Sequence, residues 1–331
     1  MRYNIVVVGA TGQVGGQVIR ELETRAFPVE KLLAFASENS AGESVEFCDE
    51  VVLVQHLDDT AFVGADIVFF CAPAHVCSAH LAQAEKQGAF CIDLSGVPRG
   101  AVAPFIIPEL SSAQILKSLT TVVSPPVAAI QAALLLAPIQ AEFGIKDTTL
   151  IVLQSASSLG GGGVDILRKQ SGALLNGRPL DDKDLPADAP AQLAYNLTPV
   201  NGGGANYPGV DIICSALCQL LGQSEISCNA ELIQAPVFYA NGLSLMCSAA
   251  AGVNVDAVSA CLSSQTGVDV ISTALIHEFG TSAANQYTEI PVAVTRVTNK
   301  GHITLWSVID NLRKGSALNA VQIAELFISC Q

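Results

Sequence analysis

The chain begins with an apolar strand that leads directly into a glycine-rich turn and a helix. Residues 2–8, RYNIVVV, end in an unbroken apolar run, and the turn GATGQVG follows at residues 9–15. Residues 15–25, GGQVIRELETR, then read as a helix. A strand without polar alternation is typical of a parallel sheet that helices cover on both faces. This start therefore constrains the chain to an α/β fold.

The same alternation of strands and helices continues to about residue 130. A helix is predicted at residues 76–88, where Gly88 ends it, and further apolar strands are predicted at residues 31–37, 66–73, 89–95 and 119–124. Buried strands separated by helices indicate a doubly wound parallel sheet. We expect this first region to be a dinucleotide-binding domain.

The glycine turn is the first candidate site. Its spacing, G-x-x-G-x-x-G, differs from the commonest dinucleotide fingerprint, but the physical role is the same, because glycines let the backbone approach a pyrophosphate at a helix N-terminus. The alternative is a tight turn without a ligand. We expect NAD or NADP, with contacts from Gly9, Thr11, Gly12, Gln13, Val14 and Gly15.

The tip of the second strand is expected to face the adenosine ribose. Its sequence, FASENSAGE, offers Ser37, Asn39 and Ser40 as hydrogen-bonding partners for either cofactor. Glu38 and Glu43 disfavour a 2′-phosphate, and the stretch contains no basic residue. Any preference for NADP is therefore expected to be weak.

The pattern changes from about residue 147. Longer strands are predicted at residues 148–157, 231–241, 243–250 and 290–298, and helices at residues 210–222 and 253–264. These segments indicate an α+β second domain whose sheet can pair with a second copy of the chain. Residues 168–201 are expected to be a loop-like arm or subunit contact, whereas residues 311–330 contain an amphipathic helix with no evident partner in the second domain.

Composition excludes several classes of partner. The chain has 331 residues, of which 50% are hydrophobic, and a net charge of -14, which opposes binding to nucleic acid and to anionic membranes. Residues 119–141 are uncharged, but prolines and glutamines interrupt them before they reach the ~20 apolar residues of a membrane span. The N-terminus does not read as a signal peptide, so we expect a cytoplasmic protein.

The chain contains ten cysteines but no C-x-x-C pair, and its five histidines lack zinc-site spacing. We expect no metal site and interpret all ten cysteines as small buried hydrophobic residues. Cys71 and Cys214 become relevant to function only if they line a cleft.

Several motifs, in this order, resemble the aspartate-semialdehyde dehydrogenase family over nearly the whole chain. They are the turn GATGQVG, SAG at 40–42, IIPE at 106–109, NLTP at 196–199 and DNLRKGSALNAVQIAEL at 310–326. The resemblance implies a dinucleotide-binding domain of residues 1–124 with 313–331, and a catalytic and dimerisation domain of residues 125–312. It also implies a homodimer with a small-molecule ligand. Ser157, Ser158 and Asn319 are then expected near the cofactor and Gln154 near the substrate.

The chain departs from this family where the chemistry takes place. The family reads N-P-N-C-S-T-I-Q where residues 124–131 read SPPVAAIQ, so Val127 takes the place of the nucleophilic cysteine. Gln234 and Asn241 replace the substrate-binding arginine and the acid/base histidine of the family pattern. Gln219 falls where the family has a phosphate-binding lysine. Arg99 is the one charged substrate-binding residue of the family pattern that this chain keeps.

Two hypotheses follow. The first is a catalytically silent family member that keeps the nucleotide pocket and the dimer surface and acts in binding, regulation or structure. The second is an enzyme that acts on another small substrate, with Cys71 as nucleophile and His75 as its activator. Residues 159–165, LGGGGVD, lack the lysine of a phosphate loop, and we interpret them as a flexible turn near the cofactor.

Overall fold

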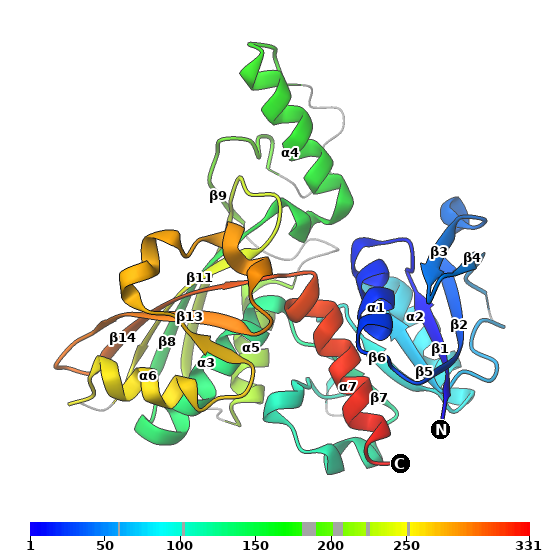
Figure 1. Ribbon diagram of the computed structural model, residues 1–331, viewed down its shortest axis with the longest axis horizontal. Helices are drawn as coiled ribbons and strands as arrows, with labels where there is room; N and C mark the ends of the chain where they lie inside the picture. Colours follow the sequence, from blue (N-terminus) through cyan, green and yellow to red (C-terminus); the bar gives the residue numbers. More distant parts are fainter. Residues whose placement is uncertain (59, 101–102, 181–189, 201–207, 223–225, 250–251) are drawn as a thin grey trace. The chain divides into compact units, whose positions relative to one another are not determined.

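The computed structural model describes residues 1–58, 60–100, 103–180, 190–200, 208–222, 226–249 and 252–331 (Figure 1). It contains two compact units. The first consists of Met1–Pro126 and Ser316–Gln331, and the second of Val127–Gly315. Each unit is built on its own seven-stranded sheet.

The sheet of the first unit has the order β3-β4-β2-β1-β5-β6-β7. Every neighbouring pair is parallel except β3 with β4, which form an antiparallel edge. The strands are β1 (Tyr3–Val8), β2 (Val29–Ala36), β3 (Ser44–Phe47), β4 (Glu50–His56), β5 (Ile67–Phe70), β6 (Phe90–Asp93) and β7 (Thr121–Val123). The doubly wound fold class is confirmed, whereas the β3–β4 edge is an addition that the sequence patterns did not indicate.

Helices cover both faces of this sheet. They are α1 (Gln13–Thr24), α2 (Ala74–Lys86) and α7 (Leu318–Ile328). Ile5 and Val7 of β1 share one core cluster with Val18 of α1, whereas Val6 shares another with Cys77 of α2. Because successive side chains of β1 point to opposite faces and both faces are buried, the strand has no polar alternation.

The amphipathic C-terminal helix α7 packs in this first unit. Its Ala320, Val321 and Ala324 are buried in the core cluster that contains α1. Near its end, the ring of Phe327 stacks on Phe90 of β6 with the centroids 3.9 Å apart. The apolar face of α7 therefore covers the first sheet.

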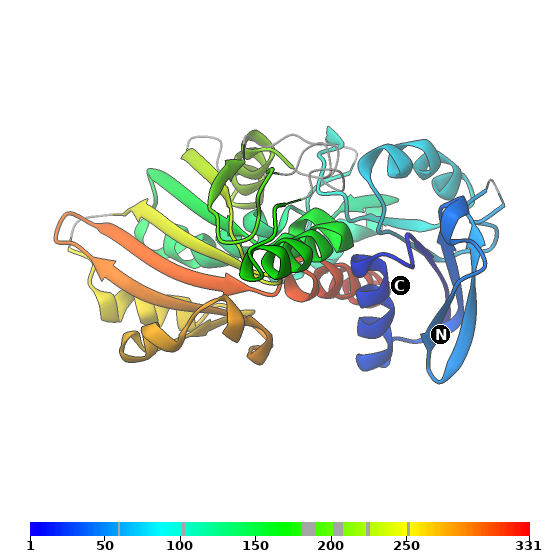
Figure 2. The ribbon, with the colours of Figure 1, turned by 90° about the horizontal axis from the view of Figure 1, so that it is seen from above.

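The sheet of the second unit has the order β12-β13-β14-β11-β8-β10-β9. Its strands are β8 (Asp147–Gln154), β9 (Thr198–Val200), β10 (Ser227–Gln234), β11 (Asn241–Ser248), β12 (Val268–Val270), β13 (Ile290–Val297) and β14 (His302–Ile309). The long antiparallel strands β13 and β14 are orange in Figure 2. The packed helices are α3 (Val127–Phe143), α5 (Val210–Leu220) and α6 (Val255–Ser263), so this unit is α+β as expected.

The arm predicted at residues 168–201 begins as a helix, which corrects that prediction. Helix α4 (Gly160–Leu175) extends to Leu175, and the tetraglycine forms its first turn rather than a flexible loop. Ile166 and Leu167 pack against Leu193, while the side-chain oxygen of Gln170 accepts from the backbone N–H of Leu193 at 2.7 Å. These contacts stabilise a helix that glycine-rich composition disfavours. The DDKD cluster at residues 181–184 lies outside the described residues.

Two further expectations were wrong. The strand predicted over residues 231–241 extends too far, because β10 ends at Gln234 and a turn follows in which Ala240 has a φ of 68°, whereas β11 (Asn241–Ser248) matches the strand predicted at 243–250. The prediction that all ten cysteines are buried holds for four of them: Cys48 is exposed in the hairpin turn between β3 and β4, and five others are only partly buried, namely Cys71, Cys214, Cys218, Cys228 and Cys330. Strand β14 also went unrecognised in the sequence.

No helix in the described part of the chain is long and apolar enough to cross a membrane.

We predict that Gly15→Ala destabilises the first unit by about 2 kcal/mol or more. A Cβ on Gly15 would lie 2.8 Å from the carbonyl carbon of Gly9, so the turn and helix must move apart. Gly16→Ala is the matched control, since its Cβ has no neighbour closer than 3.9 Å and the change favours the helix by roughly 0.5–1 kcal/mol. Urea unfolding of the two variants checks the difference, and equal stabilities would contradict it.

Candidate functional site

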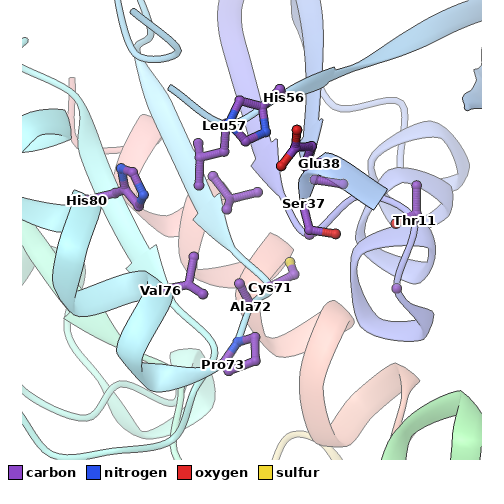
Figure 3. Close-up of a pocket in the computed structure, with 14 residues that line it drawn as sticks. Thr11, Ser37, Glu38, His56, Leu57, Cys71, Ala72, Pro73, Val76 and His80 are labelled. Atoms are coloured by element: carbon purple, nitrogen blue, oxygen red, sulfur yellow. The ribbon is translucent and has the colours of Figure 1, made fainter. Parts of the chain in front are cut away.

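A cavity of about 450 Å³ lies at the carboxyl ends of β1, β2, β4 and β5 in the first unit (Figure 3). Ligands of doubly wound sheets bind in the crevice at this edge. The cavity is lined by Val8, Gly9, Thr11, Gly12, Ala36, Ser37, Glu38, His56, Leu57, Cys71, Ala72, Pro73, Val76 and His80.

The glycine turn forms one wall of this cavity. Gly9 has a φ of 82°, and a Cβ there would lie 2.5 Å from the carbonyl oxygen of Cys71 at the end of β5. Gly12 precedes α1 and provides no side-chain cap, so the first N–H groups of the helix remain available to an anion. Thr11 and Gly12 are exposed to the cavity side, whereas Gly15 is buried behind the turn.

Three of the predicted contacts, Gln13, Val14 and Gly15, do not line the cavity and instead shape the turn and the start of α1. The wall that faces the cavity is formed by Gly9, Thr11 and Gly12. This wall carries no charged side chain, and it has no room for a Cβ at Gly9. Its residues therefore fit a dinucleotide, whose phosphates need a close approach to the backbone.

The tip of β2 places an acid in the cavity. Ser37 and Glu38 line it, whereas Asn39 and Ser40 continue into the short 3₁₀ helix Glu38–Ser40 and do not. No lysine or arginine is among the lining residues. Figure 3 shows His56 on the same side as Glu38.

Sequence patterns missed two lining histidines, His56 and His80. His56 ends β4 and pairs with Ala36 of β2, so it reaches the cavity only because β4 joins the sheet there. His80 comes from α2. The run of apolar residues within 50–56 is the signal that could have predicted a strand here, and with it the position of His56 at the strand's end.

Asn319 and Arg99 have other partners in the first unit. The side-chain nitrogen of Asn319 donates to the backbone oxygen of Ile106 and to Ser124 Oγ, at 3.2 and 2.9 Å, and Asn319 does not line the cavity. Arg99 forms an ion pair with the fully buried Asp93 at 2.5 Å. Its guanidinium is therefore held by a carboxylate of the same unit.

Cys71 lines the cavity, but its environment opposes nucleophilic chemistry. Burial raises the pKa of the Cys71 thiol well above its ordinary value, and the nearby Cys77 and Asp93 raise that pKa further. His75, the predicted activator, is exposed and does not line the cavity. A thiol in such surroundings stays protonated and is a poor nucleophile.

In the second unit, Val127 is the first residue of α3. It is half-buried and lies against Gly315, where an added Cβ would come within 2.6 Å of Val127 Cγ1. The start of this helix therefore carries a branched apolar side chain in close contact with the backbone. An aliphatic side chain has no atom that can attack a carbonyl carbon.

Gln154 and Gln234 end the neighbouring parallel strands β8 and β10 and are paired in register. The side-chain nitrogen of Gln234 donates to the backbone oxygens of Gln154 and Ala235 at 3.0 and 3.3 Å. The side-chain oxygens of both glutamines are buried without a hydrogen-bond partner. This end of the sheet thus presents two neutral acceptors.

Asn241 begins β11 and holds the turn that follows β8. Its side-chain oxygen accepts from the backbone N–H of Ser155 at 2.9 Å and from the hydroxyls of Ser155 and Ser158 at 3.0 and 3.2 Å. Ser157 Oγ bonds instead to Asn311 at 3.1 Å, and Asn311 Oδ1 also accepts from the N–H of Ala240 at 3.0 Å. Asn311, which the sequence patterns did not single out, therefore joins this network.

The remaining predicted position, Gln219, lies on α5 and is exposed. The described part of the chain holds no cluster of three or more potential metal ligands.

A doubly wound sheet with a glycine turn at its carboxyl edge, joined to an α+β unit, is typical of a two-domain protein that binds a dinucleotide. Residues 4–118 match the semialdehyde dehydrogenase NAD-binding domain, and residues 136–314 match the semialdehyde dehydrogenase dimerisation domain. The chain belongs to the semialdehyde dehydrogenase family, and its first domain is of the NAD(P)-binding type.

Similar proteins span nearly the whole chain. A USG-1 protein homolog of Pseudomonas aeruginosa is 33% identical, with 98% of this chain and 97% of the relative covered. An aspartate-semialdehyde dehydrogenase of Rickettsia bellii is 32% identical, with 99% and 98% covered. The crystal structure of aspartate-semialdehyde dehydrogenase II from Vibrio cholerae has a TM-score of 0.89 at 28% identity, with 99% of both chains covered.

We predict that saturating NAD raises the melting temperature and that NADP does so less, because Glu38 repels a 2′-phosphate. A hundredfold excess of ligand over its dissociation constant corresponds to about 2.7 kcal/mol of stabilisation.

Glu38→Arg is expected to shift the ratio of affinities toward NADP by about tenfold or more. Glu43→Arg, which changes the same charge outside the cavity lining, is the control. Thermal unfolding with each cofactor tests this, and no shift with either would contradict it.

We predict that Cys71 resists iodoacetamide at pH 7, because its raised pKa leaves little thiolate. Cys48 serves as the internal comparison, since it is the cysteine that the structure leaves exposed. Peptide mass spectrometry after timed labelling gives both rates. Labelling of Cys71 as fast as that of free cysteine would revive the hypothesis that it is a nucleophile.

Proposed function

We propose that this protein binds NAD(P) but has lost the thioester-forming reaction of its family, and that it acts as a binding, regulatory or structural member. The observation that carries the proposal is Val127 at the first position of α3. The family resemblance places a nucleophilic cysteine there, at a helix N-terminus that would favour its thiolate. NAD(P), when bound, supplies or accepts a hydride, but this chain offers no thiol at Val127 to form the acyl group that the hydride would reduce.

Replacement of the charged residues supports the same conclusion. Asn241 stands at the position of the acid/base histidine and does not titrate, and its oxygen is occupied by three donors from the turn after β8. General acid or base catalysis typically contributes a factor of about 10²–10⁴. A side chain that holds a backbone turn in this way acts in structure rather than in proton transfer.

The glutamines also oppose binding of a substrate carboxylate. At the position of the family arginine, Gln234 donates its N–H groups to the backbone of its own sheet. The unpaired oxygens of Gln154 and Gln234 are acceptors, whereas an anion needs donors, preferably charged ones. The polar groups of this sheet end therefore do not complement the negatively charged substrates that the family resemblance implies.

The parts of the chain that remain intact define what the protein can still do. The cavity beside the glycine turn suits a dinucleotide, and the matched dimerisation domain supports a homodimer. The alternative is an oxidoreductase for a different small substrate. It requires another nucleophile, and Cys71 with its raised pKa is a poor one.

The decisive experiment is turnover of aspartate semialdehyde with phosphate and either NADP or NAD. We expect no cofactor reduction above the rate without protein, whereas the Rickettsia bellii relative serves as positive control. Val127→Cys is expected to create a thiol that iodoacetamide labels, yet to restore no turnover while Gln234 and Asn241 remain. Val127→Ser is the matched control for labelling. Wild-type turnover near the rate of the control enzyme would refute the proposal.

A further inference from the structure

Two cysteines of the second unit lie close enough to react with each other. Cys214 is on α5, labelled in Figure 1, and Cys228 is the second residue of β10. The thiol of Cys228 donates a hydrogen bond to the sulfur of Cys214, and the two sulfur atoms are 3.0 Å apart. A disulfide has its sulfurs about 2.05 Å apart, so bond formation requires an approach of about 1 Å.

We propose that Cys214 and Cys228 form an oxidisable dithiol that closes to a disulfide in response to a hydroperoxide. The residues lie on a helix and a strand that pack against each other. Both are half-buried, so a small oxidant can reach them while the surrounding structure keeps the pair together. This inference does not depend on whether the chain retains enzymatic activity.

The hydrogen bond between the two thiols assigns their roles. Donation from Cys228 lowers the pKa of Cys214, and the same bond raises the pKa of Cys228. The thiolate is the reactive form, so Cys214 is the group that attacks the oxidant first. Cys228, already in contact with it, is the second thiol.

The reaction proceeds in two balanced steps. The Cys214 thiolate attacks one peroxide oxygen and the O–O bond breaks, which gives a sulfenic acid and releases an alcohol, or water from hydrogen peroxide, after the leaving oxygen takes up a proton. The Cys228 sulfur then attacks the sulfenic sulfur, the S–O bond breaks, and water leaves. Two thiols have lost two electrons, and the peroxide has gained them.

A third cysteine helps to make the assignment testable. Cys218 lies one helical turn after Cys214, and its thiol donates to the backbone oxygen of Ile226 at 3.7 Å. Its pKa is raised, chiefly by burial. Cys218 should therefore not be the first thiol to react with the peroxide. Its substitution provides a control on the same helix as Cys214.

The experiment treats the folded full-length chain with hydrogen peroxide, blocks the remaining thiols under denaturing conditions, and counts them. The ten thiols should fall by two, and dithiothreitol should restore them. Digestion after acidic residues separates residues 212–225 from residues 226–231, so a Cys214–Cys228 bridge links these two fragments. The oxidised chain should also melt at a higher temperature than the reduced chain, because the bridge restricts the unfolded state.

Variants separate the roles of the three cysteines. Cys218→Ser and Cys48→Ser should keep the bridge, whereas Cys214→Ser should abolish it. Cys228→Ser should leave a sulfenic acid on Cys214 that dimedone traps. A bridge that persists in Cys214→Ser, or wild-type protein that keeps ten free thiols at peroxide levels that oxidise glutathione, would overturn the proposal. Thiol counts and linked fragments give both results, and neither measurement depends on NAD(P) binding. A failure of this proposal can therefore be told apart from a failure to bind NAD(P).

Discussion

The close approach of backbone to backbone at the glycine turn is the constraint on which the first domain depends. Gly9 lies against the end of β5, and Gly15 lies against Gly9, with no room for a Cβ at either position. These contacts bring the end of β1, the start of α1 and the end of β5 together around one cavity. Packing this close places the turn that precedes α1 in the cavity wall, next to a helix N-terminus of the kind that favours anions.

In the second domain, side-chain amides tie the ends of neighbouring strands together. Asn241 connects β11 to the turn after β8, and Gln234 connects β10 to the end of β8. Side-chain amides can both donate and accept, so they can satisfy backbone groups in a place where charged side chains would need an ionic partner. Asn241 and Gln234 therefore stabilise the ends of β8, β10 and β11.

Much of the fold could be predicted because its signals are local. Buried strands such as β1 and β5 read as apolar runs, and the glycine turn follows β1 in the sequence. Strand β4 was missed although its valines favour a strand. Helix α4 was missed because tertiary packing overrides its composition: it begins with four glycines but is held by the packing of Ile166 and Leu167 against Leu193.

The sequence by itself indicated the family, the doubly wound class of the first domain and a valine at position 127, because these follow from residue identity and short spacing. Tertiary structure decided which side chains meet. His56 reaches the cavity because β4 pairs with β2, and Asn241 reaches Ser155 because β11 lies beside β8. Contacts between residues far apart in the chain depend on strand order and register, and no local pattern of residues encodes either.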